Sequence, residues 1–295
     1  MTLGVVFPPA LGVEELTGFA RAAEEAGVDE LWLWEDCFAD GGVVAAATAL
    51  AVTSTISVAT GILPVPLRSA VVLAMEAAAL ARLHPGRFAL GIGHGVQDWM
   101  GQAGVRADAP LALLREHAAA LRDLLAGKTV DVAGRYVSLD GVRLERPPSV
   151  VPPLWIAGEG PRTLEAAGEL GDGVLLTAGT SPGRAADAVA RAAEGRRRSG
   201  RPGPVPVAAY IFTAFAESST AIAAGRAALS EQGERWGLGD GMRDGIVGDA
   251  AEVARRVEEW RAAGVSRPVL VPLDGADRSA FVRGAGEVAR LLRLS

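Results

Sequence analysis

Three side chains that can hold or move protons stand directly after short apolar runs of the sequence. Asp36 and Cys37 follow ELWLWE (30–35), and His94 lies between two glycines in RFALGIGHG (87–95). Histidine suits proton transfer near neutral pH, whereas an ordinary thiol is mostly protonated there. His94, Asp36 and Cys37 are therefore candidate catalytic residues, with His94 the best proton donor or acceptor. The alternative is a histidine that is simply hydrogen-bonded in a loop. The three histidines and one cysteine are too scattered to predict a metal site.

The glycines of RFALGIGHG, at positions 91, 93 and 95, suggest a dinucleotide-binding fold at first sight. That fingerprint needs the first strand–helix turn and a third glycine three residues after the second. Here the run follows the fourth predicted strand, residue 96 is valine, and residues 97–99 do not predict a helix start. We therefore reject that fold. Two interpretations remain: a strand that simply bends into a loop, or a strand end where glycine, which lacks Cβ, lets a flat ring lie against the backbone.

Small residues also end the neighbouring predicted strands. Gly61-Ile62 ends the third apolar run, AGEG (157–160) ends the fifth, and Thr177 ends the sixth. Pro161 follows AGEG at the position that proline favours as the first residue of a helix. Free backbone amides at such a helix start can bind phosphate. A simple turn and helix cap is the alternative.

Eight apolar runs, separated by amphipathic segments, must position these residues. The runs are continuous rather than alternating, as expected for parallel strands covered on both faces. They are LGVVFP (3–8), ELWLWE (30–35), ISVATGIL (56–63), RFALGIG (87–93), PLWIAGE (153–159), GVLLTAG (173–179), VPVAAYIFTAF (205–215) and PVLVPLDG (268–275). Segments such as 13–27, 69–84, 161–171 and 249–264 repeat apolar residues at helical spacing. Strands that alternate with helices predict the α/β class and a (β/α)8 TIM barrel, whose strands present their carboxyl ends on one face.

Two connections are longer than the rest and interrupt the pattern after strands four and seven. The first insertion spans approximately 94–152 and contains a predicted helix (110–127) and two strand-like pieces; the second spans approximately 216–248. Such connections build the active-site face of a barrel, so we expect them to shape a substrate pocket within a single domain, 1–295. Large apolar residues in them would line that pocket, or else belong to the core or a dimer contact: Trp99, Met100, Trp236 and Met242.

Composition excludes several kinds of partner. A net charge of −6 and a pI near 5.3 offer no basic surface for nucleic acid or an anionic membrane. Residues 41–67 carry no charge over a length that could cross a bilayer, but their prolines and β-branched middle predict a helix and a buried strand instead. One cysteine excludes a disulfide framework, and the N-terminus lacks a signal peptide's basic region. We therefore expect a cytoplasmic protein.

The chain resembles the bacterial luciferase-like family of flavin-dependent oxidoreductases, within the branch that uses the deazaflavin coenzyme F420. The resemblance covers nearly the whole length. Its most specific part is LHPGRFALGIGHG (83–95) followed by AGELGDGVLLT (167–177). Further markers are WLWEDCF (32–38), ATGILPVPLR (59–68), WIAGEGPRTLE (155–165) and VGDAAEVARRVEEWRAAGV (247–265).

This resemblance implies that the protein is a homodimer, and it also implies which residues bind the cofactor. Family members have a non-prolyl cis peptide bond late in strand three that bulges against the ring, and the matching bond here is Gly61–Ile62. Asp36 matches a carboxylate that reaches the ring, and the phosphate of the cofactor tail would lie on the amides of residues 158–160. The implied cofactor-binding residues are Asp36, Gly61, Ile62, Gly93, Gly95, Ala157, Gly158, Glu159, Gly160 and Thr177.

Three positions depart from the family pattern. Cys37 stands where the deazaflavin enzymes commonly have histidine. Val96 and Thr180 replace a carboxylic acid and a lysine of the sugar-phosphate dehydrogenase relatives. We therefore expect a substrate other than a sugar phosphate.

The leading functional hypothesis is hydride transfer between coenzyme F420 and a small apolar or conjugated organic substrate, in which the cofactor carries the chemistry and the barrel orients it. The alternative among enzymes is an FMN-dependent monooxygenase on the same scaffold. A third hypothesis, motivated by the lost acid–base positions, is a barrel that binds a cofactor without catalysis.

Overall fold

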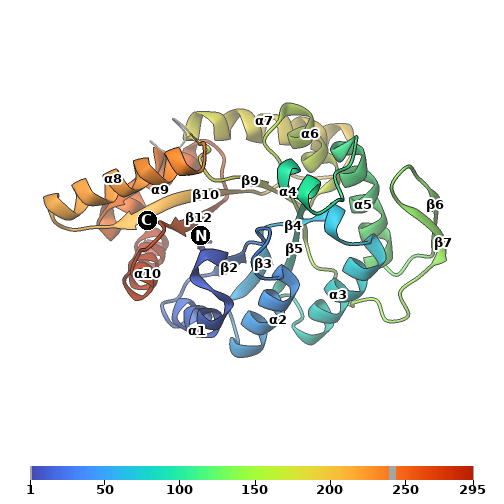
Figure 1. The fold of residues 1–295 in the computed structure, drawn as a ribbon, viewed down its shortest axis with the longest axis horizontal. Coiled ribbons are helices and arrows are strands. Elements are labelled where there is room, and N and C mark those ends of the chain that lie inside the picture. The colour runs from blue at the N-terminus through green and yellow to red at the C-terminus, as the bar shows by residue number, and fades with distance from the viewer. Residues whose placement is uncertain (1, 239–243, 295) are drawn as a thin grey trace.

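Eight parallel strands of the described chain close into a barrel. The computed structural model describes residues 2–238 and 244–294. β1 pairs with β2 and β12, and β10 pairs with β12 and β9, so the sheet closes on itself (Figure 1). The barrel strands are β1 (Gly4–Phe7), β2 (Glu30–Leu33), β3 (Ser57–Thr60), β5 (Phe88–Gly93), β8 (Leu154–Ala157), β9 (Gly173–Leu176), β10 (Val207–Phe215) and β12 (Arg267–Pro272). Seven of them fall within a predicted apolar run, and β12 begins one residue before its run (268–275), which confirms the (β/α)8 barrel.

Helices form the outer ring of the barrel (Figure 1). They are α1 (Leu16–Glu25), α2 (Gly42–Val52), α3 (Ala70–Leu83), α5 (Pro110–Leu125), α6 (Pro161–Leu170), α7 (Pro182–Arg198), α8 (Ser219–Arg235), α9 (Ala250–Ala262) and α10 (Arg278–Leu294). Four of them are preceded by a capping residue whose side chain accepts a hydrogen bond from a first-turn amide, which satisfies a donor that the helix leaves free: Ser69, Ser181, Ser218 and Asp249. α5, α6 and α7 have proline at their first position.

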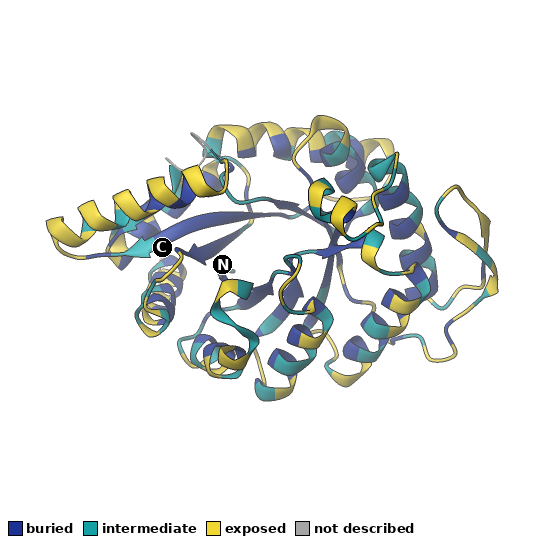
Figure 2. Ribbon diagram, in the orientation of Figure 1, coloured by how far each residue is buried: buried dark blue, intermediate teal, exposed yellow. Residues whose placement is uncertain are grey.

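Apolar side chains pack in two layers, one on each side of the strands. The larger cluster lies between the strands and the helices, whose outer surfaces are exposed (Figure 2). The smaller cluster fills the barrel interior and contains Trp32, Trp155, Tyr210 and Phe212. The rings of Trp32 and Trp155 meet edge to face, with centroids 5.3 Å apart. The interior is thus a packed core below the carboxyl ends of the strands.

Charged groups close the amino-terminal end of this interior. Glu30 and Arg267, the first residues of β2 and β12, form an ion pair, and Glu30 also accepts a 3.0 Å hydrogen bond from the indole of Trp32. The Arg267 guanidinium lies over the ring of Trp155, 5.6 Å from its centroid. Burial raises the pKa of Glu30 in spite of the nearby Arg267 charge. Pairing of these groups with one another offsets the cost of placing them in the barrel.

Both predicted insertions are present. The first contains α4 (Gln97–Gln102), α5 and a hairpin of β6 (Val130–Ala133) and β7 (Ser138–Val142), which projects beyond α5 (Figure 1). The prediction that no helix begins at residues 97–99 is wrong, because α4 starts there. The second contains α8 and β11 (Ile246–Gly248), which extends the sheet from β10. Met242, predicted to line a pocket, lies outside the described residues.

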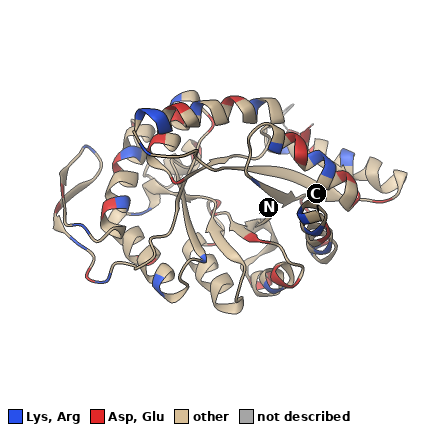
Figure 3. Cartoon of the chain, turned by 180° about the vertical axis from the view of Figure 1, so that it is seen from behind, with Lys and Arg blue, Asp and Glu red and all other residues tan. Residues whose placement is uncertain are grey.

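The uncharged stretch 41–67 contains α2, β3 and the short strand β4 (Leu63–Pro64), as the sequence predicts. Among the described helices, none has the length and apolar character needed to cross a membrane. Acidic and basic side chains are intermixed on the outer helices, while the strands carry few charges (Figure 3).

Candidate active site

A cavity of about 580 Å³ opens where β2, β3, β5, β8 and β9 end. We call it the strand-end cavity. The carboxyl-end face of a (β/α)8 barrel is where active sites are built. Its lining residues are Glu35, Asp36, Ile62, Pro64, Gly93, His94, Gly95, Val96, Gln97, Trp99, Ala157, Gly158, Glu159, Gly160, Thr163 and Thr177.

Most of the predicted site residues meet in this cavity. The candidate acid–base residues Asp36 and His94 line it, as do Ile62, both candidate glycines of β5 and its loop, the 157–160 segment and Thr177. Two predicted residues are absent from its wall. Cys37 lies one position beyond Asp36, and Gly61 lies beneath Ile62 in the barrel interior.

The glycines of RFALGIGHG make room for protein atoms. A Cβ on Gly91 would overlap the carbonyl oxygen of Thr60, and one on Gly93 would lie 3.1 Å from the side chain of Ile62. Gly95 has a positive φ of 72°, and a Cβ there would lie 3.0 Å from the Met100 sulfur. The sequence interpretation expects a flat ring to approach this strand end; the close approach that the structure shows is made instead by the end of β3, its following residues and Met100.

The Gly61–Ile62 peptide bond is cis, as the family resemblance implies. The Tyr210 hydroxyl donates a 2.7 Å hydrogen bond to the carbonyl oxygen of Gly61. A Cβ on Gly61 would overlap that hydroxyl and would lie 2.8 Å from the Trp32 ring, so the position has no room for a side chain. Ile62 is held above this contact and forms part of the cavity wall.

Asp36 presents a carboxyl group whose pKa is shifted toward neutral pH. Burial raises the pKa of Asp36 to about 6, and no described residue donates a hydrogen bond to its carboxylate. Burial and the neighbouring carboxylates also raise the pKa of the Cys37 thiol, so that this thiol is protonated at neutral pH. A second non-prolyl cis bond, Cys37–Phe38, which the sequence does not reveal, follows these residues.

Glu35 is a cavity residue that sequence reasoning missed. Its carboxylate accepts two 2.6 Å hydrogen bonds from the guanidinium of Arg68 and a third, also 2.6 Å, from the amide of Gly42. The Glu35 side chain is buried, and the bidentate pair fixes its orientation. A carboxylate held in this way is a structural support for the neighbouring Asp36.

His94 is held at the rim by its surroundings. Its Nδ1 lies 3.1 Å from the carbonyl oxygen of Gly95; because a carbonyl only accepts, Nδ1 carries the proton and Nε2 is left as an acceptor. The side-chain amide of Gln97 donates through Nε2 to the carbonyl oxygens of His94 and Gly95, at 3.0 and 3.1 Å. Gln97 was also missed, since its role depends on the turn that brings α4 back over His94.

The start of α6 supplies free backbone donors to the cavity. The amide of Gly158 donates to Leu175 O at 3.3 Å, whereas those of Glu159 and Gly160 have no partner among the described residues. A Cβ on Gly158 would lie 2.7 Å from the methyl group of Thr163, whose side chain faces the same cavity. The carboxylate of Glu159 accepts a hydrogen bond from the Thr177 hydroxyl. Free amides at the start of a helix can hold a phosphate, together with the hydroxyl of Thr163 in the first turn of α6.

Residues of the insertions are divided between wall and core. Trp99 and Val96 line the cavity, and Val96 is half exposed. Met100 is fully buried and belongs to the core. Trp236 packs against Trp34 and Phe212, with ring centroids 6.1 and 5.4 Å away. The wall near His94 is therefore apolar.

The cavity has the features that a flat ring with a phosphate tail requires. The apolar side chains of Ile62, Pro64 and Trp99 face a volume typical of cofactor sites. Among the residues that the structure describes, neither the amides of residues 159 and 160, which line it, nor the Asp36 carboxyl has a hydrogen-bond partner. The residues present thus fit a deazaflavin or flavin nucleotide.

Known proteins resemble the chain in sequence and in fold. A 5,10-methylenetetrahydromethanopterin reductase of Methanolobus tindarius is 34% identical over 212 residues, which cover 71% of this chain and 64% of the reductase. The chain thus spans just under two thirds of that relative's length. An F420-dependent glucose-6-phosphate dehydrogenase of Kineococcus radiotolerans is 30% identical over 290 residues, covering 92% of this chain and 83% of the dehydrogenase.

Among solved structures, the coenzyme F420 dependent tetrahydromethanopterin reductase from Methanopyrus kandleri superposes with a TM-score of 0.85 at 22% identity, over 99% of both chains. This likeness shows the shared fold. The family model described as luciferase-like monooxygenase matches residues 1–267. The chain therefore belongs to the luciferase-like family of oxidoreductases.

Proposed function

We propose that the protein is an F420-dependent oxidoreductase that acts on a small organic substrate. The observation that carries this proposal is the arrangement of the strand-end cavity, in which an apolar wall, an unpaired Asp36 carboxyl with a raised pKa and free amides at the start of α6 face the same space. The F420-dependent relatives support it. When bound, F420 supplies a hydride donor or acceptor at C5 of its ring.

The chain's own residues bind, orient and move protons. Ile62 and Pro64 would support one face of the ring, and the Glu159 and Gly160 amides would hold the tail phosphate. The Asp36 carboxyl, with a pKa of about 6, can gain or lose a proton in the working pH range. His94 Nε2 can accept a proton at the rim of the cavity, because Nδ1 is already used by Gly95 O.

The substrate is proposed to be small and largely apolar. Val96 and Trp99 line the outer part of the cavity, where the sugar-phosphate enzymes would need a carboxylic acid at position 96. Thr180, the third position that departs from the family pattern, is buried and donates to Thr177 O at 2.9 Å, so it does not face the cavity.

Paired anaerobic titrations with F420 and with FMN, followed by absorbance and fluorescence, test the proposal. We expect saturable binding of F420 and weaker binding of FMN, with the F420 affinity reduced in Asp36→Asn. Tight binding of FMN alone would support the luciferase-like monooxygenase alternative, to be followed by oxygen consumption. Retained F420 binding without turnover on a broad panel of reducible substrates would support a non-catalytic barrel.

We also propose a homodimer in a reducing cytoplasm, with no nucleic-acid or membrane partner. Val72 and Met75 lie one turn apart on α3 and are 48% and 58% exposed, an apolar surface of the kind that mediates association. The acidic pI and the intermixed surface charges (Figure 3) support the absence of a polyanionic partner. Sedimentation of the wild type and of Met75→Glu tests the dimer, which the added charge should dissociate.

A further inference from the structure

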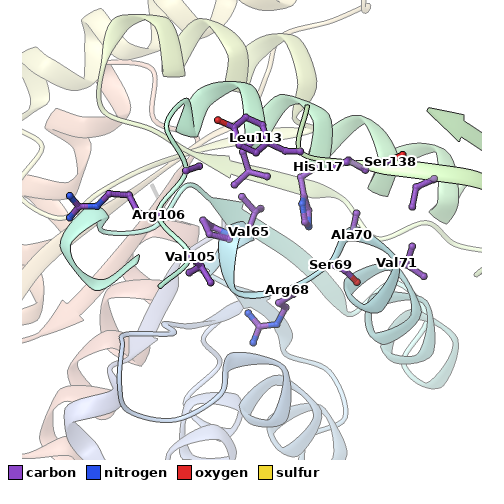
Figure 4. Close-up of a pocket in the computed structure, with 15 residues that line it drawn as sticks. Val65, Arg68, Ser69, Ala70, Val71, Val105, Arg106, Leu113, His117 and Ser138 are labelled. Carbon is purple, nitrogen blue, oxygen red and sulfur yellow. The ribbon is translucent and has the colours of Figure 1, made fainter. Parts of the chain in front are cut away.

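A second cavity lies under the first insertion and shares no lining residue with the strand-end cavity. It has a volume of about 360 Å³ and is bounded by residues 65–71, residues 105–107, α5 and residues 136–139 (Figure 4). Small organic ligands bind in cavities of about 300–1,000 Å³. We call it the insertion cavity.

His117 lines the insertion cavity and lacks hydrogen-bond partners there. The residue is 2% exposed, and neither ring nitrogen is bonded to a described residue. Figure 4 shows the ring pointing from α5 into the space between Val65 and Ala70. Buried polar groups are nearly always paired in folded proteins, so two free nitrogens on one buried ring call for a partner from outside the chain.

The ionisation of His117 defines what such a partner must offer. Burial lowers the pKa of His117 to about 4, so the imidazole is neutral at pH 7. A neutral imidazole donates through one nitrogen and accepts through the other. A hydroxyl or amide group can either donate to the accepting nitrogen or accept from the donating one, and because the two nitrogens point in different directions it pairs with one of them.

The remaining walls of the insertion cavity select for an uncharged ligand. Arg68 and Arg106 border it, but Arg68 is held by Glu35 at 2.6 Å and Arg106 by Asp98 at 3.0 Å. Both guanidinium groups are thus already neutralised. Buried side chains of the lining, among them Leu113 and Val137, are apolar. Burying an ion here without a free countercharge would be unfavourable.

We propose that the insertion cavity is a second binding site, for a small, uncharged and largely apolar molecule whose single hydroxyl or amide group hydrogen-bonds to His117. This site is separate from the proposed cofactor site and does not depend on the identity of that cofactor.

Titration of the full chain with phenol, the smallest aromatic member of this class, tests the proposal. The protein contains only three histidines, so the ring ¹⁵N signals of ¹⁵N-histidine-labelled protein are easily assigned. We expect the His117 signals to shift saturably with phenol while those of His84, which does not line the cavity, stay constant. Toluene lacks the hydroxyl. Calorimetry should therefore give toluene a dissociation constant at least about tenfold larger than that of phenol.

Matched variants locate the effect. His117→Leu should abolish the preference for phenol over toluene while leaving toluene binding intact. Ala70→Leu, which adds three carbons inside the cavity, should abolish both, whereas Leu83→Met at the exposed end of the same helix should change neither. A non-saturating response of His117, equal affinities for phenol and toluene, or a shift confined to His94 would overturn the proposal, because the cavity would then hold water only or phenol would occupy the strand-end cavity.

Discussion

The Tyr210 hydroxyl donates a 2.7 Å hydrogen bond to the carbonyl oxygen of Gly61, and so ties β10 to the end of β3 across the barrel interior. Burial raises the pKa of Tyr210 well above its ordinary value, so the phenol is a neutral donor at neutral pH. The bond supports the segment that carries Ile62 into the wall of the strand-end cavity.

Replacing Tyr210 by Phe should therefore lower the free energy of unfolding by about 1–3 kcal/mol, because the buried carbonyl of Gly61 loses its donor. F420 affinity should also fall, since Ile62 is less firmly held. Urea unfolding and fluorescence titration measure the two effects. Tyr136→Phe is the matched control: its hydroxyl accepts from Ala109 N in the first insertion, so F420 affinity should not change. Equal losses of affinity in both variants would contradict the assignment.

The two glycines that flank Glu159 should respond differently to a methyl group. In Gly158→Ala the new Cβ meets the Thr163 methyl group at 2.7 Å and must displace a side chain of the proposed phosphate site. In Gly160→Ala the Cβ enters open space, and the φ of −73° suits alanine. We expect F420 to bind at least about tenfold more weakly to Gly158→Ala, a loss of about 1.4 kcal/mol, and nearly unchanged to Gly160→Ala. Equal affinities would show that phosphate is not held at this helix start.

Asp36 should make stability depend on pH in a direction opposite to that of an ordinary salt-bridged carboxylate. Its pKa is about 6 in the folded protein and near the ordinary value of 3.8 in the unfolded chain, so the folded state binds the proton more tightly. Ionisation therefore destabilises the fold as the pH rises from about 4 to about 6, by at most about 3 kcal/mol.

Asp36→Asn should remove that dependence and gain stability relative to the wild type above pH 6. Urea unfolding at pH 4, 5, 6 and 7 checks this. The same substitution should remove an inflection near pH 6 from the pH profile of turnover. Parallel stability curves for the two proteins would show that Asp36 ionises normally.

Breaking the Glu35–Arg68 pair should lower the free energy of unfolding mainly because it leaves a buried carboxylate without a countercharge, and less because the attraction between the two groups is lost. Arg68→Met leaves the buried Glu35 carboxylate with only the Gly42 amide, at a cost of about 3–5 kcal/mol in unfolding free energy. Glu35→Gln combined with Arg68→Met removes the charge as well and should recover most of the loss. The exposed pair of Arg106 and Asp98 is the control, and Arg106→Met should cost no more than about 1 kcal/mol. A double variant no better than Arg68→Met would contradict this account.

The barrel could be predicted because its strands are buried on both faces. Runs such as VPVAAYIFTAF must be continuously apolar for β10 to touch both the interior and the helices, and that pattern is readable without tertiary information. Asp36, His94 and Thr177 followed from the same logic, since residues at the carboxyl ends of parallel strands meet on one face.

The remaining features depend on contacts between distant segments. Arg68 is 33 positions from Glu35, and no local pattern marks the pair. A close approach at the glycines of β5 was predicted for a flat ring, whereas the neighbours that the structure shows, Thr60 and Ile62, belong to another strand and its continuation. α4 was missed because it is six residues long, contains a glycine and has no side-chain cap. His117 is one residue of a regular amphipathic helix, and only the packing of the insertion reveals its free nitrogens.

The ion pair of Glu30 and Arg267, with the indoles of Trp32 and Trp155 packed against it, closes the amino-terminal end of the barrel interior. Because charged and aromatic side chains fill that end of the barrel interior, a molecule bound in the strand-end cavity would exchange with solvent at the carboxyl-end face, where the loops after the strands lie.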